Sequence, residues 1–222
     1  MIVQWIEWFP DLLEGLGVSV LVALFSILIG LVLGVMIALA SISQRRIIRW
    51  PAIAVVEILR GVPLLVLIYL VYFGLPSVNI TLEALVAAIA AIGLNTSAYM
   101  AEIVRGGLHS IPVGQYEASA CLGMSRWQEL RVVILPQTLR TVFSPLVSYS
   151  IIVFQATSLC YLIGVQELLS RAFAIGSITF EYLSVLMLVG IVYAVISIAG
   201  SRIAHGFDSG AAAGGARHRV RI

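Results

Sequence analysis

The sequence contains no lysine, and only 11% of its 222 residues carry a charged side chain. Soluble globular domains carry charge on roughly a quarter of their residues. Together with 61% hydrophobic residues and a mean hydropathy of +1.07, this shortage of charge excludes a soluble globular domain. Without lysine the chain also has no Gly-x-x-x-x-Gly-Lys phosphate-binding loop, which excludes a P-loop ATPase.

Long apolar runs are abundant, and they lack the alternation of β-strands. Because the hydrocarbon core of a bilayer offers no water to backbone N–H and C=O groups, apolar runs of about 20 residues cross it as helices. Five charge-free runs cover residues 15–44, 61–82, 84–101, 141–166 and 182–201. We therefore expect an all-α membrane protein with five transmembrane helices. The second should begin near Pro51 and end at Gly74, and the fourth should be interrupted between Thr157 and Gly164.

The arginines are unevenly distributed along the chain. Eleven of the thirteen follow the first, third and fifth runs: Arg45, Arg46, Arg49, Arg105, Arg126, Arg131, Arg140, Arg202, Arg217, Arg219 and Arg221. Basic residues are retained on the cytoplasmic side of a membrane. Five threaded spans therefore place the N-terminus outside and the C-terminus in the cytoplasm. The net charge of +2 follows from this topology and does not indicate nucleic-acid binding.

The same pattern predicts the domain organisation. We expect one transmembrane domain over residues 1–205, with a cytoplasmic loop at about residues 106–140. Residues 206–222 are rich in glycine and alanine and end in a basic stretch. This tail is expected to be flexible and to touch anionic lipid.

Cysteine and histidine are scarce, which limits the chemistry available. Cys121 and Cys160 are expected at different depths, so a disulfide between them is not expected. The three histidines, His109, His205 and His218, lie outside the apolar runs and lack a matched ligand set. We therefore predict no metal site, and an intramembrane Ser-His enzyme would lack its base.

The 106–140 loop has the pattern of two short helices. Ile111-Pro112 starts the first, in which the Glu117 carboxylate suits the positive helix end. Gly123 breaks the run, and Ser125 with Gln128 forms a capping box for the second helix. Small residues in the first helix, Ala118, Ser119 and Ala120, leave a face for another protein. Leu130, Val133 and Ile134 are expected to anchor the second helix to the bundle.

This loop resembles that of the membrane subunit of a bacterial ABC importer. The family signature is Glu-Ala-Ala, three residues, Gly, nine residues, Ile, one residue, Leu-Pro. The chain has Glu117-Ala118-Ser119, Gly123, Val133 and Leu135-Pro136 at that spacing, with two conservative departures, Ser119 and Val133.

Further segments are similar to the polar amino acid branch of that family, so that the resemblance covers about residues 12–205. They are Glu57 to Leu65, Ala98 to Gly107, Ser110 to Gln115 and Thr157-Ser158-Leu159. The resemblance implies a type I ABC importer permease fold. It also implies a second permease subunit, identical or homologous, two ATPase subunits that carry ATP and Mg²⁺, and a periplasmic or lipid-anchored binding protein in a bacterial inner membrane.

The resemblance assigns no cofactor and no catalytic residue to the chain itself. The expected ATPase-coupling residues are Glu117, Ala118, Ser119, Gly123, Leu135 and Pro136. Among them, Glu117 would make a polar contact and Gly123 would be the hinge, so that closure of the ATPase dimer moves the loop helices as levers. The alternative is a self-sufficient secondary transporter or channel, but the five runs show no clear inverted repeat.

Charged pairs occur near the ends of two apolar runs. Glu57 and Arg60 are one helical turn apart, as are Glu102 and Arg105. We expect both pairs to neutralise themselves. For Arg60, the alternative is direct contact with the substrate or a gate.

Two polar triplets lie inside the runs and have two interpretations. They line a midplane cavity for an amino acid, or they hydrogen-bond neighbouring helices, and we expect at least one to face the pathway. They consist of Asn95, Thr96 and Ser97 in the third run and Gln155, Thr157 and Ser158 in the fourth. Many members of the branch carry Lys-Asp where this chain has Gln155-Ala156. The pair Phe154-Gln155 before Thr157-Ser158-Leu159 looks more like permeases for acidic amino acids.

Overall fold

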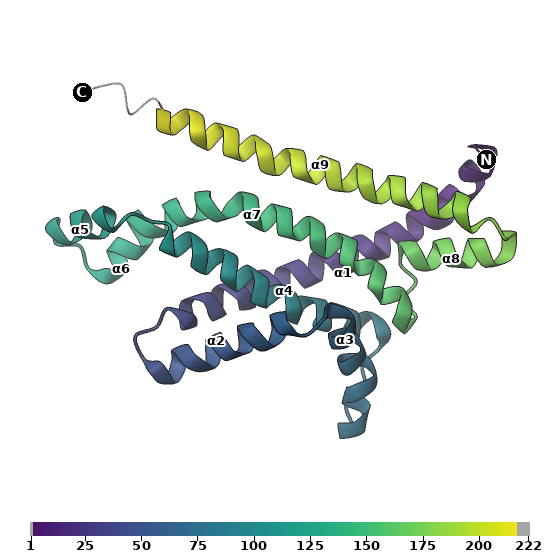
Figure 1. The fold of residues 1–222 in the computed structure, drawn as a ribbon, viewed down its shortest axis with the longest axis horizontal. Helices are drawn as coiled ribbons and strands as arrows, with labels where there is room; N and C mark the ends of the chain where they lie inside the picture. Colours follow the sequence, from purple (N-terminus) through teal and green to yellow (C-terminus); the bar gives the residue numbers. More distant parts are fainter. Residues whose placement is uncertain (1, 217–222) are drawn as a thin grey trace.

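The computed structural model describes residues 2–216, and these residues form helices with short connections and no strand. The all-α prediction is therefore confirmed (Figure 1). In chain order the elements are α1 (Ile2–Ser41), α2 (Arg46–Gly61), α3 (Leu64–Tyr69), η1 (Leu70–Gly74), η2 (Leu75–Val78), α4 (Ala84–His109), α5 (Val113–Cys121), α6 (Arg126–Gln128), η3 (Glu129–Ile134), α7 (Leu135–Ala156), η4 (Thr157–Ile163), α8 (Leu168–Thr179) and α9 (Tyr182–Ala216).

Within residues 2–216, four helical segments are long and apolar enough to cross a membrane, and a bent pair brings the number to five if it is counted as one span. The four are Gln4–Ser41, Ala84–His109, Arg126–Ile163 and Tyr182–Ala204. The pair joins Arg46–Gly61 to Leu64–Val78 at an angle of 102°. The predicted five spans are therefore present in this form.

The second span differs from the single helix that the sequence predicts. It begins at Arg46, before the expected start near Pro51, and it breaks at Val62-Pro63. Val62 has an extended backbone, with φ −86° and ψ 127°. Proline clashes with a helical residue before it, so Val62 is driven out of the helical region. The bend separates an amphipathic half, α2, from an apolar half that continues through η2.

The fourth span is interrupted where the sequence predicts. α7 gives way to the 3-10 turn η4 at Thr157, and Gly164 ends this turn with φ +85°. In that left-handed region glycine avoids the clash of a Cβ atom. A short apolar helix, α8, follows before α9 and was not expected from the sequence.

Helices α1 and α4 pack closely because glycines face side chains across their interface. A Cβ atom at Gly30 would collide with the Thr96 side chain, and one at Gly34 would lie 2.9 Å from the Cβ of Met100. The small-xxx-small spacing of Gly30 and Gly34 thus allows close approach within one subunit.

The connection from α1 to α2, the α5–α6 loop and the C-terminal end of α9 gather at one end of the bundle in Figure 1. We call this the arginine-rich end, because Arg45 lies in the connection from α1 to α2, and α2 and α6 begin with Arg46 and Arg126. The N-terminus and α8 lie at the opposite end. α9 continues to Ala216, beyond the expected start of the tail at residue 206, while Arg217, Arg219 and Arg221 lie outside the described residues.

Candidate functional site

The first loop helix begins and ends as its sequence predicts. α5 follows Pro112, and Ile111 before it is buried in a cluster with Leu108 and Ile134. At its C-terminus the Met124 N–H donates to the Ser119 carbonyl at 3.1 Å, and the Gly123 N–H donates to the Ala120 carbonyl at 3.0 Å. This is the Schellman pattern, in which a left-handed residue closes the helix. Gly123 supplies it with φ +68°.

The second loop helix has the predicted capping box, but it is not a separate helix. The Gln128 N–H donates to Ser125 Oγ at 3.3 Å, and the Ser125 N–H donates to Gln128 Oε1 at 2.9 Å. α6 has only 3 residues and runs through the π turn η3 directly into α7. Loop and span therefore form one continuous helical segment, Arg126–Ile163.

Burial divides the predicted coupling residues into two groups. Glu117, Ala118, Gly123, Leu135 and Pro136 are exposed. Ser119 is 2% exposed, and its Oγ donates to the Gln115 carbonyl at 2.8 Å. The expectation that Ser119 lies on the free face is therefore wrong, because this side of α5 packs toward the bundle.

Large apolar side chains are exposed on the same loop. The exposed fractions are 70% for Val113, 77% for Leu122 and 66% for Trp127. Val113 begins α5, Leu122 directly follows it, and Trp127 lies in α6. Both helices lie at the arginine-rich end (Figure 1). Exposed apolar side chains gathered on one segment and bordered by polar residues are typical of a protein interface. As predicted, the loop is anchored beneath by Ile134, with Leu130 and Val133 packed against the same cluster.

Arg60 makes a different ion pair from the predicted one. It lies 3.7 Å from Glu102 of α4, and the described residues contain no Glu57–Arg60 ion pair. The Arg60 guanidinium also lies 5.3 Å from the centre of the Tyr99 ring, which stacks on Tyr149 at 5.0 Å. The α4 face attracts Arg60 because it offers both a carboxylate and an aromatic ring.

The second predicted pair is present. Arg105 donates to both Glu102 oxygens, at 2.9 Å from Nε and 2.7 Å from Nη2. Such two-point contact is the strong geometry for arginine and a carboxylate. Glu102 is therefore shared between Arg105 on its own helix and Arg60 on α2.

The polar triplets divide between helix contacts and exposed positions. Asn95 and Thr96 are buried, and Asn95 Nδ2 donates to the Leu59 carbonyl of α2 at 2.9 Å. Thr157 is also buried and donates to the Phe154 carbonyl. In contrast, Gln155 is exposed and donates to Ser197 of α9 at 2.9 Å, and Ser158 is partly exposed. Hydrogen bonding between helices thus accounts for Asn95, whereas Gln155 remains accessible.

The sequence reading missed a fully buried carboxylate, Glu167. It is the N-cap of α8 and accepts backbone N–H bonds from Leu169 at 2.9 Å and Ser170 at 2.7 Å. Ser19 of α1 and Tyr193 of α9 each donate to the same carboxylate at 3.3 Å. Burial raises the pKa of Glu167, whereas the donated hydrogen bonds lower it. The sequence signal for this N-cap was a glutamate directly before an apolar helical run.

Residues 2–216 contain no group of three or more His, Cys, Asp or Glu side chains that could hold a metal ion. The arrangement is instead that of a membrane-embedded subunit. Apolar spans carry few charged groups, and an exposed loop at one end carries large exposed apolar side chains.

Comparison with known proteins identifies the class. The family described as "Binding-protein-dependent transport system inner membrane component" matches residues 8–212, and the chain belongs to this family. The chain is 40% identical over 195 residues to a probable amino-acid ABC transporter permease protein, YckA, of Bacillus subtilis, covering 87% of this chain and 86% of YckA. It is 33% identical over 188 residues to the arginine transport system permease protein ArtQ of the same organism, covering 84% and 86%.

A solved structure supports the same assignment for the fold. The crystal structure of an amino acid ABC transporter with histidines superposes with a TM-score of 0.90 at 29% identity, covering 94% of this chain and 98% of the other. The chain therefore has the type I ABC importer permease fold and is the transmembrane subunit of an ABC importer for amino acids. It is a multi-pass inner-membrane transport component and not an enzyme, since a separate ATPase subunit supplies the energy.

Proposed function

We propose that this chain imports polar amino acids that a periplasmic or lipid-anchored binding protein delivers. Two permease subunits, identical or homologous, would form the pathway, and two ATPase subunits carrying ATP and Mg²⁺ would drive it. The observation that carries this proposal is the loop helix α5, which is closed by Gly123 and anchored through Ile111 and Ile134 to the bundle. A partner that binds α5 and changes its position would therefore move the helix bundle as well.

The N-terminus is proposed to lie outside the membrane and the C-terminus in the cytoplasm. The positive-inside rule places the arginine-rich end in the cytoplasm. Two connections and the C-terminal end of α9 meet at that end, which favours one common side for their arginines (Figure 1). Residues 1–205 would act as one transmembrane domain, with residues 206–222 as a basic cytoplasmic tail.

The ATPase is proposed to contact the exposed loop residues Glu117, Ala118, Gly123, Leu135 and Pro136. The buried Ser119 would stabilise α5 through its hydrogen bond to the Gln115 carbonyl. The continuous segment Arg126–Ile163 supports a lever mechanism, because a helix transmits a displacement along its length. A push on α6 would reach η4, the interruption at the other end of this segment. That would couple ATPase closure to the pathway.

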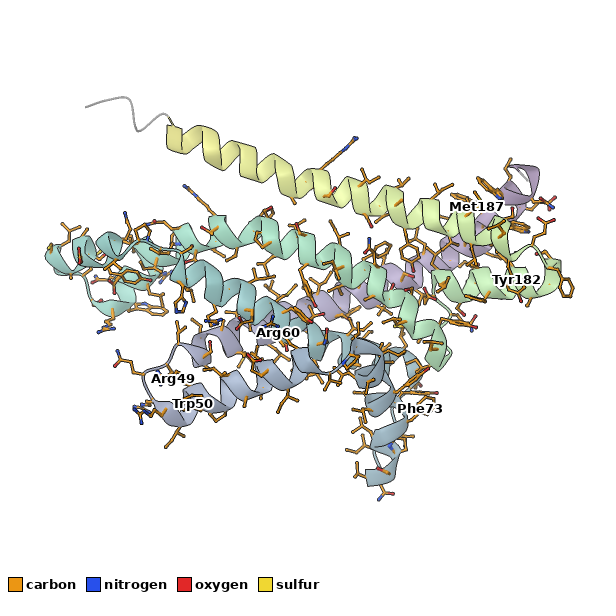
Figure 2. All side chains as sticks on the ribbon, in the orientation of Figure 1. Arg49, Trp50, Arg60, Phe73, Tyr182 and Met187 are labelled. Atoms are coloured by element: carbon orange, nitrogen blue, oxygen red, sulfur yellow. The ribbon has the colours of Figure 1, made fainter. Side chains whose placement is uncertain are left out.

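The transport pathway is proposed to follow the face that carries Arg60. The Arg60 side chain is 38% exposed in the single subunit and lies on the amphipathic helix α2, beside the bend within the second span. A charge at that depth is costly against lipid, so this face must meet water or protein. A second permease subunit placed against it would enclose a polar path. Figure 2 shows Arg60 near the centre of the molecule.

Arg60, Gln155 and Ser158 are the accessible candidates for substrate contact. Asn95, Thr96 and Thr157 would support the pathway from behind, because they are buried between helices. The Arg60 guanidinium would bind a carboxylate of the substrate, in agreement with the resemblance to permeases for acidic amino acids.

The variant Glu117→Lys tests the proposed coupling. Reversing the charge of this exposed side chain should reduce co-purification of the ATPase subunit about tenfold, the order expected when a charge-assisted contact becomes a repulsion. Membrane insertion should be unchanged, because Glu117 lies outside the spans. Glu83→Lys, at an exposed glutamate that also lies outside the spans, is the matched control. Full co-purification and uptake in Glu117→Lys would contradict the assigned contact.

A further inference from the structure

The helix α2, which forms the first part of the second span, is too short to cross a membrane. Its 16 residues measure about 24 Å, less than the hydrocarbon core of about 30 Å. After Gly61 the chain bends by 102° into the segment Leu64–Val78. The length of α2 is close to that of one lipid leaflet with its head groups, about 20 Å. Because α2 begins at the arginine-rich end, it lies beside the leaflet on that side.

One side of α2 is apolar and exposed along most of its length. The exposed fractions are 88% for Ile47, 61% for Trp50 and 63% for Ile58, and Ala54 between them is also exposed. Spacings of three and four residues place these four side chains, which we call the α2 stripe, on one helix face. The stripe is about 16 Å long, close to half the thickness of the hydrocarbon core. One acyl chain of a single leaflet therefore matches it in length.

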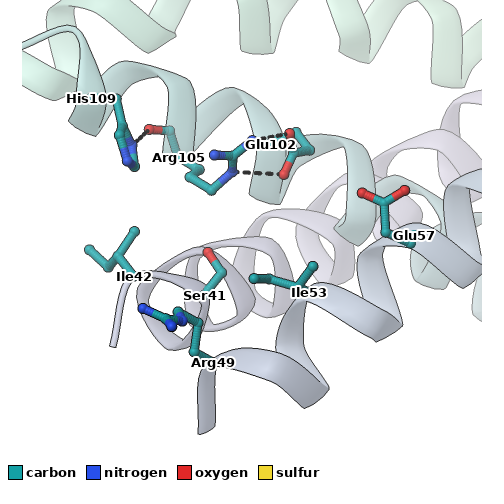
Figure 3. A pocket seen from close by; sticks show the side chains of 8 residues that line it. All are labelled: Ser41, Ile42, Arg49, Ile53, Glu57, Glu102, Arg105 and His109. Atoms are coloured by element: carbon teal, nitrogen blue, oxygen red, sulfur yellow. Dashed lines mark hydrogen bonds and ion pairs between the residues drawn. The ribbon is translucent and has the colours of Figure 1, made fainter. Parts of the chain in front are cut away.

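Three arginines lie at the start of the α2 stripe. Arg45 directly precedes α2, Arg46 and Arg49 lie in its first turn, and Arg45 and Arg46 are exposed. No ion pair between the described residues includes any of the three. Figure 3 shows the Arg49 guanidinium pointing away from Glu57, the only acidic residue of α2. The start of α2 thus carries positive charge that no carboxylate of the described residues neutralises.

Trp50 connects the arginines to the α2 stripe. The Arg49 guanidinium lies 6.0 Å from the centre of the Trp50 ring. Arg46 precedes Trp50 by one helical turn, so that both arginines are neighbours of this ring. Figure 2 shows Arg49 and Trp50 next to each other at the arginine-rich end. Tryptophan is typical of the membrane interface, where its ring lies at the level of the lipid head groups.

The α2 stripe does not face the proposed transport pathway. Arg60 follows Ile58 by two residues, so their side chains point about 160° apart around the helix. Arg60 lies 3.7 Å from Glu102 of α4, and a second permease subunit on that side would leave Ile58 uncovered. Positive charge at one end of an exposed apolar stripe complements a molecule with an anionic head and a long apolar chain.

We propose that the α2 stripe and the arginines at its start bind an anionic phospholipid of the cytoplasmic leaflet. The phosphate contacts Arg46 and Arg49, and one acyl chain lies along α2 from Trp50 to Ile58. The inference rests on the proposed function for the side of the membrane, but it does not depend on which amino acid is transported. Each arginine contributes about fivefold in affinity, which corresponds to about 1 kcal/mol for a basic residue near an anionic membrane surface.

Lipid binding to the permease–ATPase complex tests this site. The delipidated complex in detergent is titrated with phosphatidylglycerol or phosphatidylcholine, and native mass spectrometry resolves each bound lipid. Arg46→Gln combined with Arg49→Gln should weaken the tightest phosphatidylglycerol binding about 25-fold, or about fivefold for each charge. Arg46→Lys combined with Arg49→Lys should keep it, because the charges remain. Phosphatidylcholine, which has no net charge, should bind more weakly and respond little to these variants.

Two controls separate this site from a general effect of charge. Arg140→Gln combined with Arg202→Gln removes the same charge at exposed positions outside α2, and should leave phosphatidylglycerol binding unchanged. Millimolar glycerol 3-phosphate, which has the phosphate without acyl chains, should not displace the lipid. Displacement by glycerol 3-phosphate would indicate an anion site that does not use the α2 stripe, and would overturn the proposal.

Two further results would also overturn it. One is unchanged phosphatidylglycerol binding in Arg46→Gln with Arg49→Gln, or an equal loss in the Arg140 and Arg202 control. The other is a disulfide between two permease subunits that carry Ile58→Cys, because protein would then cover the α2 stripe. Each of these results would leave co-purification of the ATPase subunit intact, so the proposed transport function would stand without the lipid site.

Discussion

At the scale of single residues, two carboxylates that are largely withdrawn from solvent, Glu102 and Glu167, each bind several groups at once. Glu102 serves two arginines on two helices. Glu167 accepts hydrogen bonds from four groups on α1, α8 and α9. A carboxylate away from water is tolerated when its oxygens are satisfied in this way. Sequence spacing identified Glu102–Arg105, but it assigned Arg60 to the wrong partner because contacts between helices are not encoded in spacing.

Replacement of Glu167 is expected to destabilise the far end of the bundle. In Glu167→Ala the N–H groups of Leu169 and Ser170 lose their acceptor, and unsatisfied buried groups cost about 1 to 3 kcal/mol. The thermal denaturation midpoint of the purified protein should fall. Glu167→Gln should be intermediate, since one oxygen remains. Glu7→Gln is the control at an exposed glutamate and should leave the midpoint unchanged.

At the scale of elements, glycines decide where helices end and how closely they pack. Gly123 ends α5 with φ +68°, and Gly34 allows α4 to approach α1. The sequence indicated the break at Gly123, because glycine after a helical run is typical of a helix end. It did not indicate the bend at Val62-Pro63 or the existence of α8. Short apolar segments do not reveal by their composition whether they continue a span or turn away from it.

The turn after α5 should be sensitive to substitution. Gly123→Ala places a Cβ in the left-handed region, which costs about 1 kcal/mol and favours another turn geometry. We expect weaker ATPase association, measured by co-purification, with normal amounts of protein in the membrane. Gly114→Ala, within α5 and with no atom within 4 Å of the new Cβ, should associate normally. Normal association of Gly123→Ala would show that the turn does not position α5.

The α1–α4 interface should respond to bulk at Gly34. Gly34→Leu would collide with Met100 Cβ and the Ser97 carbonyl, each 2.9 Å from the site of the new Cβ. Overpacking of this kind costs about 1 to 3 kcal/mol, so the thermal denaturation midpoint should fall. Gly17→Leu on the same helix meets no atom within 4 Å and is the matched control. Equal midpoints for the two variants would contradict this packing.

At the scale of the whole molecule, the two ends have different tasks. The arginine-rich end holds the exposed α5–α6 loop, while the opposite end is held together by Glu167 and by hydrogen bonds from Gln4 to Glu181 and from Trp5 to Ser184. The long segment Arg126–Ile163 joins them. This arrangement supports movement of the subunit as a body when its loop is displaced.

The proposed orientation predicts which side of the membrane exposes Cys121. This residue is exposed on α5, whereas Cys160 is buried, so the native chain has one accessible thiol among its two. A membrane-impermeant maleimide should label inside-out vesicles and not intact spheroplasts. Labelling should decrease when the ATPase subunit is bound, because α5 would then be covered. Labelling of intact spheroplasts would show that Cys121 lies outside the membrane and would contradict the proposed topology.

The amino-acid sequence by itself determined the class of this protein. Its apolar runs demand helices in lipid, its arginines follow alternate runs, and its loop carries a motif whose turn and cap are local interactions between near neighbours such as Ser125 and Gln128. Only the tertiary structure decided which polar groups meet. The partners of Arg60, Ser119 and Glu167 depend on helix rotation and on contacts that small differences in packing select, and no local pattern specifies those.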